Sequence, residues 1–262
     1  MFVKELYIHP VKSLGGIRVE EFELTSTGAK GDRQWMVVTP DGEFMTQRKY
    51  ASMCLISTAL SEAHDHPSPL HLSHPESGSI AAPRGGGASL DVRVWNDSVR
   101  AEDCGDEVAA WLSATLDKSC RLAYMPIGAE RAVPDSTSTV GFADAYPLLL
   151  CNEASLNDFN QQLPFPIGMN RFRPNIVVAG ADEWAEDSWS SLTAGENALT
   201  VNSPCTRCVM PSIDPDTGEK QMAVIDALNK HRRFGTETRF GVNASFAQTG
   251  RLKVGDPVSV VS

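Results

Sequence analysis

Residues 34–48, QWMVVTPDGEFMTQR, indicate two β-strands joined by a tight turn. Asp41-Gly42 lies between the two runs, and an Asp-Gly pair favours a hairpin because glycine accepts the positive φ that such turns need. Two earlier stretches alternate between apolar and polar residues, as half-buried strands do: FVKELYIHP at 2–10 and IRVEEFELT at 17–25. Together these stretches predict a small β-barrel or sandwich.

The pattern of strands changes after SMCLISTAL at 52–60. The segment that follows is rich in Gly, Pro, Ser and His, so we expect a long loop between strands over residues 61–90. Strands are predicted again at 90–97, with a hairpin turn at Asn96-Asp97, and at 119–126. Between them, apolar residues at helical spacing predict a helix over 105–117: Val108, Trp111, Leu112 and Leu116.

The second half mixes strands with two helices. The polar stretch after Pro126 suggests a boundary near residue 125, and hence two domains, 1–124 and 125–262. Asn152 is a predicted N-cap for a helix over 153–163, and MAVIDALNKH at 222–231 predicts the last helix. Strands are expected at 146–151, 173–180, 198–204, 208–213, 238–250 and 253–261. The fold class is therefore mainly β with a few helices (α+β).

Composition and charge argue against several classes of function. The 262 residues carry 23 basic and 33 acidic side chains, which argues against a general nucleic-acid surface. The longest apolar run, 146–151, is far shorter than the roughly 20 residues of a membrane-spanning helix, and the N-terminus lacks the apolar region of a secretory signal. We therefore expect a cytoplasmic protein without a membrane partner, in which any anionic ligand is held by a local cluster of Lys and Arg.

Two of the six cysteines stand apart because they are three residues apart, in SPCTRCVMPSIDPDTGEK at 203–220. A zinc site needs four ligands, and neither a second cysteine pair nor paired histidines at fixed spacing accompany Cys205 and Cys208. The His residues of the 61–90 segment are interpreted as solvated. A redox dithiol usually opens a helix, whereas Cys208 runs into a strand-like stretch. A single thiolate, favoured by the neighbouring Arg207, could bind a soft metal, but spacing alone leaves these alternatives open.

Six stretches in order resemble the MOSC-domain family, the domain named for molybdenum cofactor sulfurase. The resemblance covers essentially the whole chain and is carried by LYIHPVKSLGG (6–16), GAKGDRQWMVV (28–38), FADAYPLLLCNEASL (142–156), NRFRPNIVV (170–178), VNSPCTRCVMPSIDPDTGEK (201–220) and LKVGDPVSVV (252–261). It implies a MOSC-type β-barrel preceded by an N-terminal MOSC β-barrel domain. The most similar group is the mitochondrial amidoxime-reducing components and the bacterial relatives that detoxify hydroxylated purines.

The resemblance also implies a molybdenum cofactor and the residues that hold it. Cys208 is the implied thiolate ligand of molybdenum, while Cys205 is interpreted as a packed small side chain. The cofactor ends in a phosphate, for which the implied binding residues are Lys12, Ser13, Arg33 and Arg173, with Arg207 next to the metal ligand. Asp144 to Tyr146 are expected to contribute backbone contacts to the pterin of the cofactor. As a further hypothesis, Asp214 orients the bound molecule or relays protons.

The implied reaction is reduction of N-hydroxylated compounds to the parent amine, amidine or purine. The chain has no iron–sulfur cysteine cluster, so a separate electron donor is expected, of ferredoxin, flavin reductase or cytochrome type. Two alternatives remain: a sulfur carrier with a persulfide on Cys208, and a module that binds or delivers molybdenum cofactor without reducing anything. The pyridoxal-phosphate domain that would generate sulfur is missing, so no pyridoxal phosphate is expected.

Overall fold

The computed structural model describes residues 1–61, 68–133 and 138–261. Over these ranges the chain is mainly β, with three α-helices: α1 (Asp106–Leu116), α2 (Glu153–Asn160) and α3 (Met222–His231). The predicted fold class, mainly β with a few helices, is confirmed. None of the described helices is long and apolar enough to cross a membrane. His64 and His66 of the predicted 61–90 loop lie outside the described residues.

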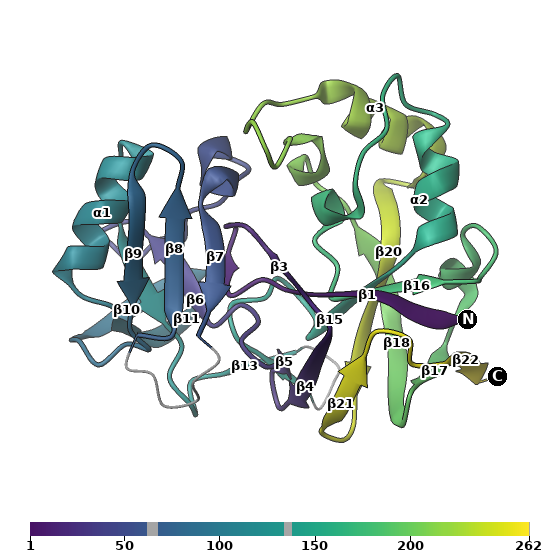
Figure 1. Cartoon of the computed structure of the whole chain (residues 1–262), viewed down its shortest axis with the longest axis horizontal. Coiled ribbons are helices and arrows are strands. Elements are labelled where there is room, and N and C mark those ends of the chain that lie inside the picture. Colours follow the sequence, from purple (N-terminus) through teal and green to yellow (C-terminus); the bar gives the residue numbers. More distant parts are fainter. Residues whose placement is uncertain (62–67, 134–137, 262) are drawn as a thin grey trace.

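The larger lobe of the molecule is built on one sheet of nine described strands (Figure 1). The sheet is open, with β22 and β3 at its two edges, and β19 pairs with the first residues of β20. In spatial order the strands are β22 (Val258–Val261), β17 (Ser191–Ala194), β18 (Asn197–Thr206), β20 (Glu237–Phe246), β15 (Leu148–Asn152), β16 (Ile176–Ala179), β1 (Phe2–Ile8) and β3 (Ile17–Val19), with β19 at Arg233–Phe234.

The smaller lobe carries α1 and two further sheets (Figure 1). Within the described residues, the first sheet has five strands in the order β10 (Ser89–Val94), β11 (Asp97–Asp103), β12 (Arg121–Tyr124), β6 (Trp35–Val38) and β2 (Val11–Lys12). The second has three strands in the order β7 (Ser57–Leu60), β8 (Leu70–His74) and β9 (Gly78–Ala82).

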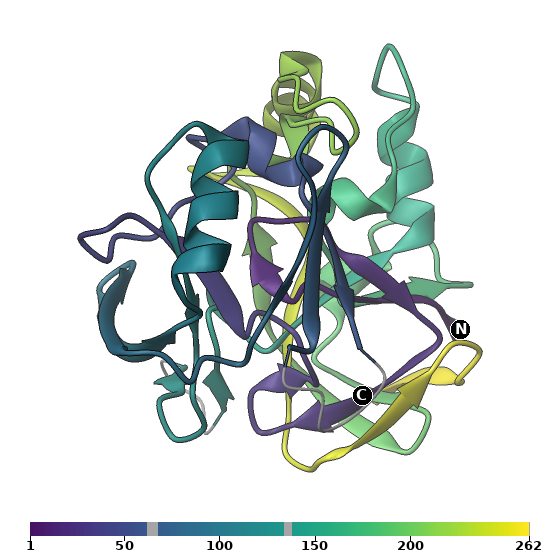
Figure 2. The same ribbon diagram turned by 60° about the vertical axis from the view of Figure 1, so that its left-hand side comes forward.

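Two small sheets complete the pairing of the described chain. They are β21 (Gly250–Lys253), β4 (Glu21–Thr25) and β5 (Gly28–Ala29), and the pair β13 (Arg131–Ala132) and β14 (Thr139–Val140). Because β1, β3 and β4 all pair with strands of the second half or lie in its sheet, the N-terminal residues help to build both lobes. The boundary at residue 125 stays a prediction. Both ends of the chain lie on the larger lobe (Figure 1 and Figure 2), and the Val258 amide donates to the Met1 carbonyl.

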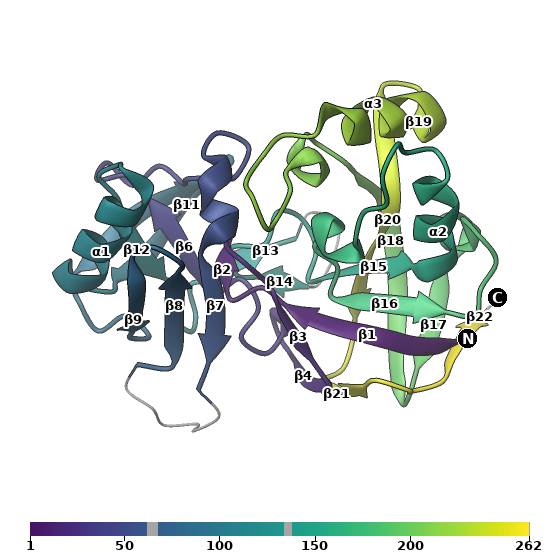
Figure 3. The ribbon, with the colours of Figure 1, turned by 45° about the horizontal axis from the view of Figure 1, so that its top comes forward.

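The helices form where the sequence predicts them. The Asn152 side chain accepts a hydrogen bond from the Ala154 amide, which confirms the predicted N-cap of α2. Val108 and Leu112 of α1 are buried, as their helical spacing requires. Helices α2 and α3 lie at one end of the larger lobe (Figure 3), and they bury Phe159, Val224 and Leu228 around Phe240 of β20.

Three local predictions are wrong. The segment 61–90 is not one long loop, because β8 and β9 pair there as a hairpin, with Leu70 and Leu72 buried in the core of the smaller lobe. The second strand of the 34–48 hairpin is reduced to a single bridge between Val38 and Phe44. The stretch after Cys208 is not a strand but a short helical turn, Met210–Ser212, since its proline cannot donate to a sheet.

Candidate functional site

A cavity of about 470 Å³ lies between the two lobes. The smaller lobe contributes residues from β2 and from the chain next to β6 and β10. The larger lobe contributes the start of β15, the end of β18 and Asn243 within β20. Six of the seven predicted site residues line this cavity: Lys12, Ser13, Arg33, Arg173, Arg207 and Cys208. The fold therefore brings Lys12 and Cys208 to one cavity, although they are almost 200 residues apart in the chain.

We call Lys12, Ser13, Arg33 and Arg173 the cation side of the cavity. Three of these residues have left-handed backbone, with φ of 67° at Ser13, 46° at Arg33 and 56° at Arg173. Each such conformation costs about 1–2 kcal/mol for a residue with a side chain, and it persists only where the surrounding contacts enforce it. Strained backbone at three residues that line the same cavity is typical of a binding site.

Hydrogen bonds to main-chain oxygens hold the two arginines of the cation side. Arg33 donates to the Asn175 side chain at 3.1 Å and to the Arg173 carbonyl at 3.1 Å, and it pairs with Asp32 at 2.5 Å. Arg173 donates to the Leu14 carbonyl at 2.5 Å. Burial, together with Arg33, lowers the pKa of Arg173 to about 9, so this side chain remains a cation at neutral pH.

One N–H group of the cation side makes no hydrogen bond within the described chain. Nη2 of Arg173 is buried and has no hydrogen-bond partner among the described residues. A buried N–H group without a partner costs about 1–3 kcal/mol, and charged groups cost more. A ligand oxygen in the cavity would remove this cost.

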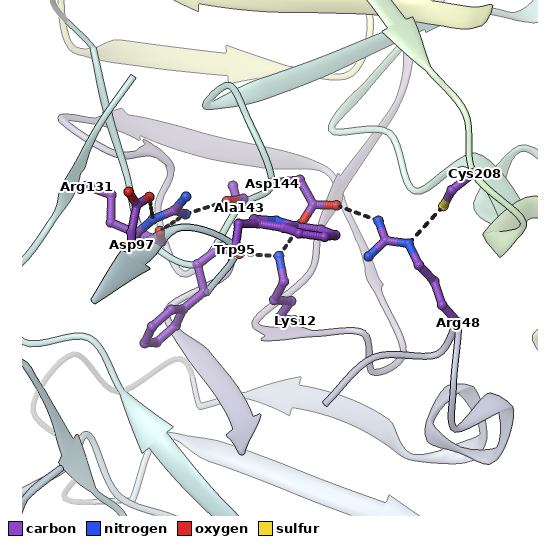
Figure 4. A network of polar contacts seen from close by, with 10 residues as sticks. Lys12, Arg48, Trp95, Asp97, Arg131, Ala143, Asp144 and Cys208 are labelled. Carbon is purple, nitrogen blue, oxygen red and sulfur yellow. Dashed lines mark hydrogen bonds and ion pairs between the residues drawn. The ribbon is translucent and has the colours of Figure 1, made fainter. Parts of the chain in front are cut away.

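Asp144 contacts three side chains of the smaller lobe at one wall of the cavity (Figure 4). Its carboxylate pairs with Lys12, accepts a hydrogen bond from the Trp95 indole at 3.1 Å, and pairs with Arg48 at 3.2 Å. Burial alone would raise the pKa of Asp144, but Lys12 and Arg48 hold it below its ordinary value. Burial lowers the pKa of Lys12, and Asp144 opposes that shift.

We call Cys205, Arg207 and Cys208 the thiol side. Both thiols line the cavity, but each accepts a hydrogen bond from a different arginine. Arg207 donates to Cys205 at 3.0 Å and to the Phe172 carbonyl at 2.8 Å, while Arg48 donates to Cys208 at 3.1 Å. Burial by itself would lower the pKa of Arg207, and the neighbouring thiols Cys205 and Cys151 raise it above its ordinary value. The Cys208 thiol is thus contacted by Arg48, whereas Arg207, its neighbour in sequence, contacts Cys205.

The described residues offer no group of three or more His, Cys, Asp or Glu side chains that could hold a metal ion. All six cysteines have free thiols. A metal at Cys208 would therefore need most of its ligands from a bound cofactor.

Asp214, the seventh predicted site residue, is not among the residues that line the cavity. Its carboxylate pairs with the buried Arg171 at 2.8 Å and accepts from the Gln221 amide at 3.1 Å. It also accepts from the Asp216 amide, which closes the Asp-Pro-Asp-Thr-Gly turn. These contacts tie the turn to the 170–178 stretch, and a role of Asp214 in catalysis stays a prediction.

The sequence interpretation missed Arg48 and Trp95. Arg48 ends the 34–48 stretch and Trp95 lies in the turn of the β10–β11 hairpin, with a left-handed φ of 55°. Neither has a neighbouring motif that predicts a site. Only the folded chain brings them to Asp144 and Cys208.

The comparisons with known proteins agree with this architecture. Residues 1–119 match the MOSC N-terminal beta barrel domain, and residues 137–259 match the MOSC domain. The mitochondrial amidoxime-reducing component 1 of Mus musculus is 32% identical over 98% of this chain and 81% of its own length. The mitochondrial amidoxime reducing component 2 of Bos taurus is 30% identical over 98% of this chain and 82% of its own length. The chain therefore belongs to the MOSC-domain family that includes the amidoxime-reducing components.

Proposed function

We propose that this protein is a molybdenum-cofactor-dependent reductase of N-hydroxylated compounds. The observation that carries the proposal is the cavity itself, with Lys12, Ser13, Arg33 and Arg173 on its cation side and a thiol, Cys208, on its thiol side. Relatives of about 30% identity over nearly the whole chain are named for the reduction of amidoximes. The substrate class proposed here is amidoximes, hydroxylamines and N-hydroxylated purines.

The residues present fit such a cofactor. Its phosphate requires cations and N–H donors, which Lys12, Arg33 and the unpartnered Nη2 of Arg173 supply. Its polar ring edge would find a second buried N–H group without a partner in the described chain, Nε of Arg207. A soft metal prefers sulfur ligands. The thiol of Cys208 offers such a ligand at the cavity, where it accepts a hydrogen bond from Arg48. The volume of about 470 Å³ is within the range of cofactor sites.

The bound cofactor would supply the two-electron chemistry that accepts the oxygen of the N–O bond. The reaction consumes two electrons and two protons, breaks the N–O bond, and leaves the parent amine or amidine and water. The protein residues bind and orient. Lys12 and Arg173 would neutralise the anionic end of the cofactor, and Cys208 would hold its metal end. The electrons come from a separate donor protein, which we propose to be of ferredoxin, flavin reductase or cytochrome type.

The test is elemental analysis combined with an assay. Protein from a host that makes molybdenum cofactor should contain about one molybdenum atom per chain, bound through a pterin dithiolene. With a chemical electron donor, it should reduce benzamidoxime to benzamidine. Metal-free and inactive protein from such a host would overturn the proposal. Metal without turnover would instead indicate a cofactor-delivery module.

A further inference from the structure

Arg48 reaches Cys208 from the other lobe of the molecule. It follows the single bridge that remains of the 34–48 hairpin, in a turn where the Lys49 and Tyr50 amides donate to the Thr46 carbonyl. From there its guanidinium crosses the cavity, and Nε donates to the Cys208 thiol at 3.1 Å (Figure 4). The contact joins residues that are 160 positions apart.

Two other side chains hold the guanidinium in this position. Its Nη2 donates to Asp144 at 3.2 Å, and its central carbon lies 4.7 Å from the centre of the Trp95 ring. Phe44 packs edge-on against that indole, with ring centres 4.9 Å apart, and Asp144 accepts from the indole nitrogen. A planar guanidinium that is stacked and bonded on two sides has little freedom left. Its orientation toward the sulfur is therefore set before any ligand arrives.

Arg207, which is adjacent in sequence, does not take this place. Its guanidinium lies over the Phe172 ring at 5.4 Å and donates to Cys205 and to the Phe172 carbonyl. The two thiols of the Cys-x-x-Cys stretch are thus distinguished by their arginines. Cys208 accepts from an arginine of the opposite lobe, and Cys205, at the end of β18, accepts from an arginine two residues further along the chain.

We infer that Arg48 is a positioning residue that tunes the metal held by Cys208, an inference that rests on the function proposed above. A metal-bound thiolate keeps lone pairs that can accept an N–H bond, so the contact with Nε can persist when the cofactor is bound. A donor and a positive charge at the sulfur draw electron density away from it. They stabilise the electron-rich, reduced metal and raise its reduction potential.

The test compares Arg48→Gln and Arg48→Lys in the cofactor-loaded protein. We expect molybdenum to be retained, and the molybdenum midpoint potential, measured by a redox titration followed by electron paramagnetic resonance, to shift to more negative values in Arg48→Gln. The value of kcat should fall by about tenfold to a hundredfold, as for other partners of metal ligands, with a smaller change in KM. Arg48→Lys keeps the charge but loses the fork, so its potential should lie between those of wild type and Arg48→Gln.

Arg93→Gln is the matched control. Arg93 lies in β10 of the same lobe and forms an exposed pair with Glu43 at 3.3 Å, with 62% of its own side chain exposed. This variant removes an equal charge without touching the cavity, so its potential should equal that of wild type. The inference about Arg48 would be overturned if the midpoint potential shifted equally in Arg93→Gln and Arg48→Gln, or if it were unchanged in loaded Arg48→Gln. Either result would leave the proposed function standing. Wild-type protein that takes up no molybdenum would overturn the proposed function as well.

Discussion

The cation side and the thiol side of the cavity are built in different ways. The cation side is held by left-handed backbone at Ser13, Arg33 and Arg173 and by hydrogen bonds to buried main-chain oxygens. The thiol side spans the end of β18 and the residues after it. There Cys208 accepts from Arg48 of the other lobe, and Cys205 accepts from the side chain of Arg207, two residues further along the chain. The difference indicates that the main chain places the charges rigidly on the side proposed to bind an anion. On the side proposed to bind a metal, neighbouring side chains orient the sulfur.

The strongest test of this comparison is the replacement of each cysteine by alanine. Cys208→Ala should remove essentially all molybdenum and all turnover, since the metal would lose its thiolate from the protein. Cys205→Ala should largely retain both, because Cys205 contacts Arg207 rather than Arg48. Molybdenum per chain and the rate of benzamidoxime reduction are the measurements. Equal losses in both variants would indicate that the thiol side acts as a cysteine pair.

The cation side is tested by Arg173→Met. Charge-assisted hydrogen bonds contribute about 1.5–3 kcal/mol, so cofactor retention should fall by roughly tenfold to a hundredfold. Unfolding in urea should show only a small loss of stability, because the variant loses the hydrogen bond to the Leu14 carbonyl but also removes a buried N–H group that lacks a partner in the described chain. Cofactor content after dialysis and the free energy of unfolding are the two measurements. A variant that unfolds readily but still retains its cofactor would mean that Arg173 serves the fold and not the ligand.

The variant Asp214→Asn tests whether Asp214, in the turn that follows the thiol side in the chain, has a catalytic or a structural role. The carboxylate pairs with Arg171, whose side chain is only 6% exposed, so weakening the pair should cost about 1–3 kcal/mol of stability. Turnover per bound molybdenum should be unchanged if the contacts of Asp214 are structural. A normal urea midpoint with lost turnover would support the alternative, in which Asp214 relays protons.

The smallest expected effect concerns His9, which lies beneath the cation side. Burial, and then Arg33 and Arg173, lower the pKa of His9 well below its ordinary value, so the folded protein keeps this ring neutral. The unfolded chain binds a proton below about pH 6.5, and the folded chain does not. The free energy of unfolding therefore contains the full contribution of the neutral His9 ring above pH 6.5. This contribution falls by about 1.4 kcal/mol per pH unit below pH 6.5, until the pKa of His9 in the folded protein is reached.

His9→Gln should flatten this slope, since the amide does not titrate and can still donate to the Pro174 carbonyl that Nε2 of His9 contacts at 3.0 Å. The measurement is the free energy of unfolding in urea at pH 7 and pH 5.5, for wild type and variant. Equal slopes would show that the acid sensitivity of the protein arises elsewhere.

Much of the fold was accessible from local pattern. The helices at 106–116, 153–160 and 222–231 and the N-cap at Asn152 follow from spacing and capping, which act within a few residues. The β8–β9 hairpin was missed because its strands are short and rich in Ser, His and Gly. Its stability comes from burying Leu70 and Leu72 against the rest of the lobe. The helical turn after Cys208 was missed because Val209 and Met210 suit a strand equally well.

The sequence by itself determined the class of the fold, its helices and the set of chemical groups available: two nearby thiols, and Lys and Arg residues in recognisable stretches. Tertiary structure decided which groups meet. It assigned Arg48 to Cys208 and Arg207 to Cys205, turned Asp214 toward Arg171, and brought Trp95 to Asp144. The physical reason is range: propensity, spacing and capping act along the chain, whereas a hydrogen bond depends on a distance near 3 Å between atoms that only the packed lobes bring together.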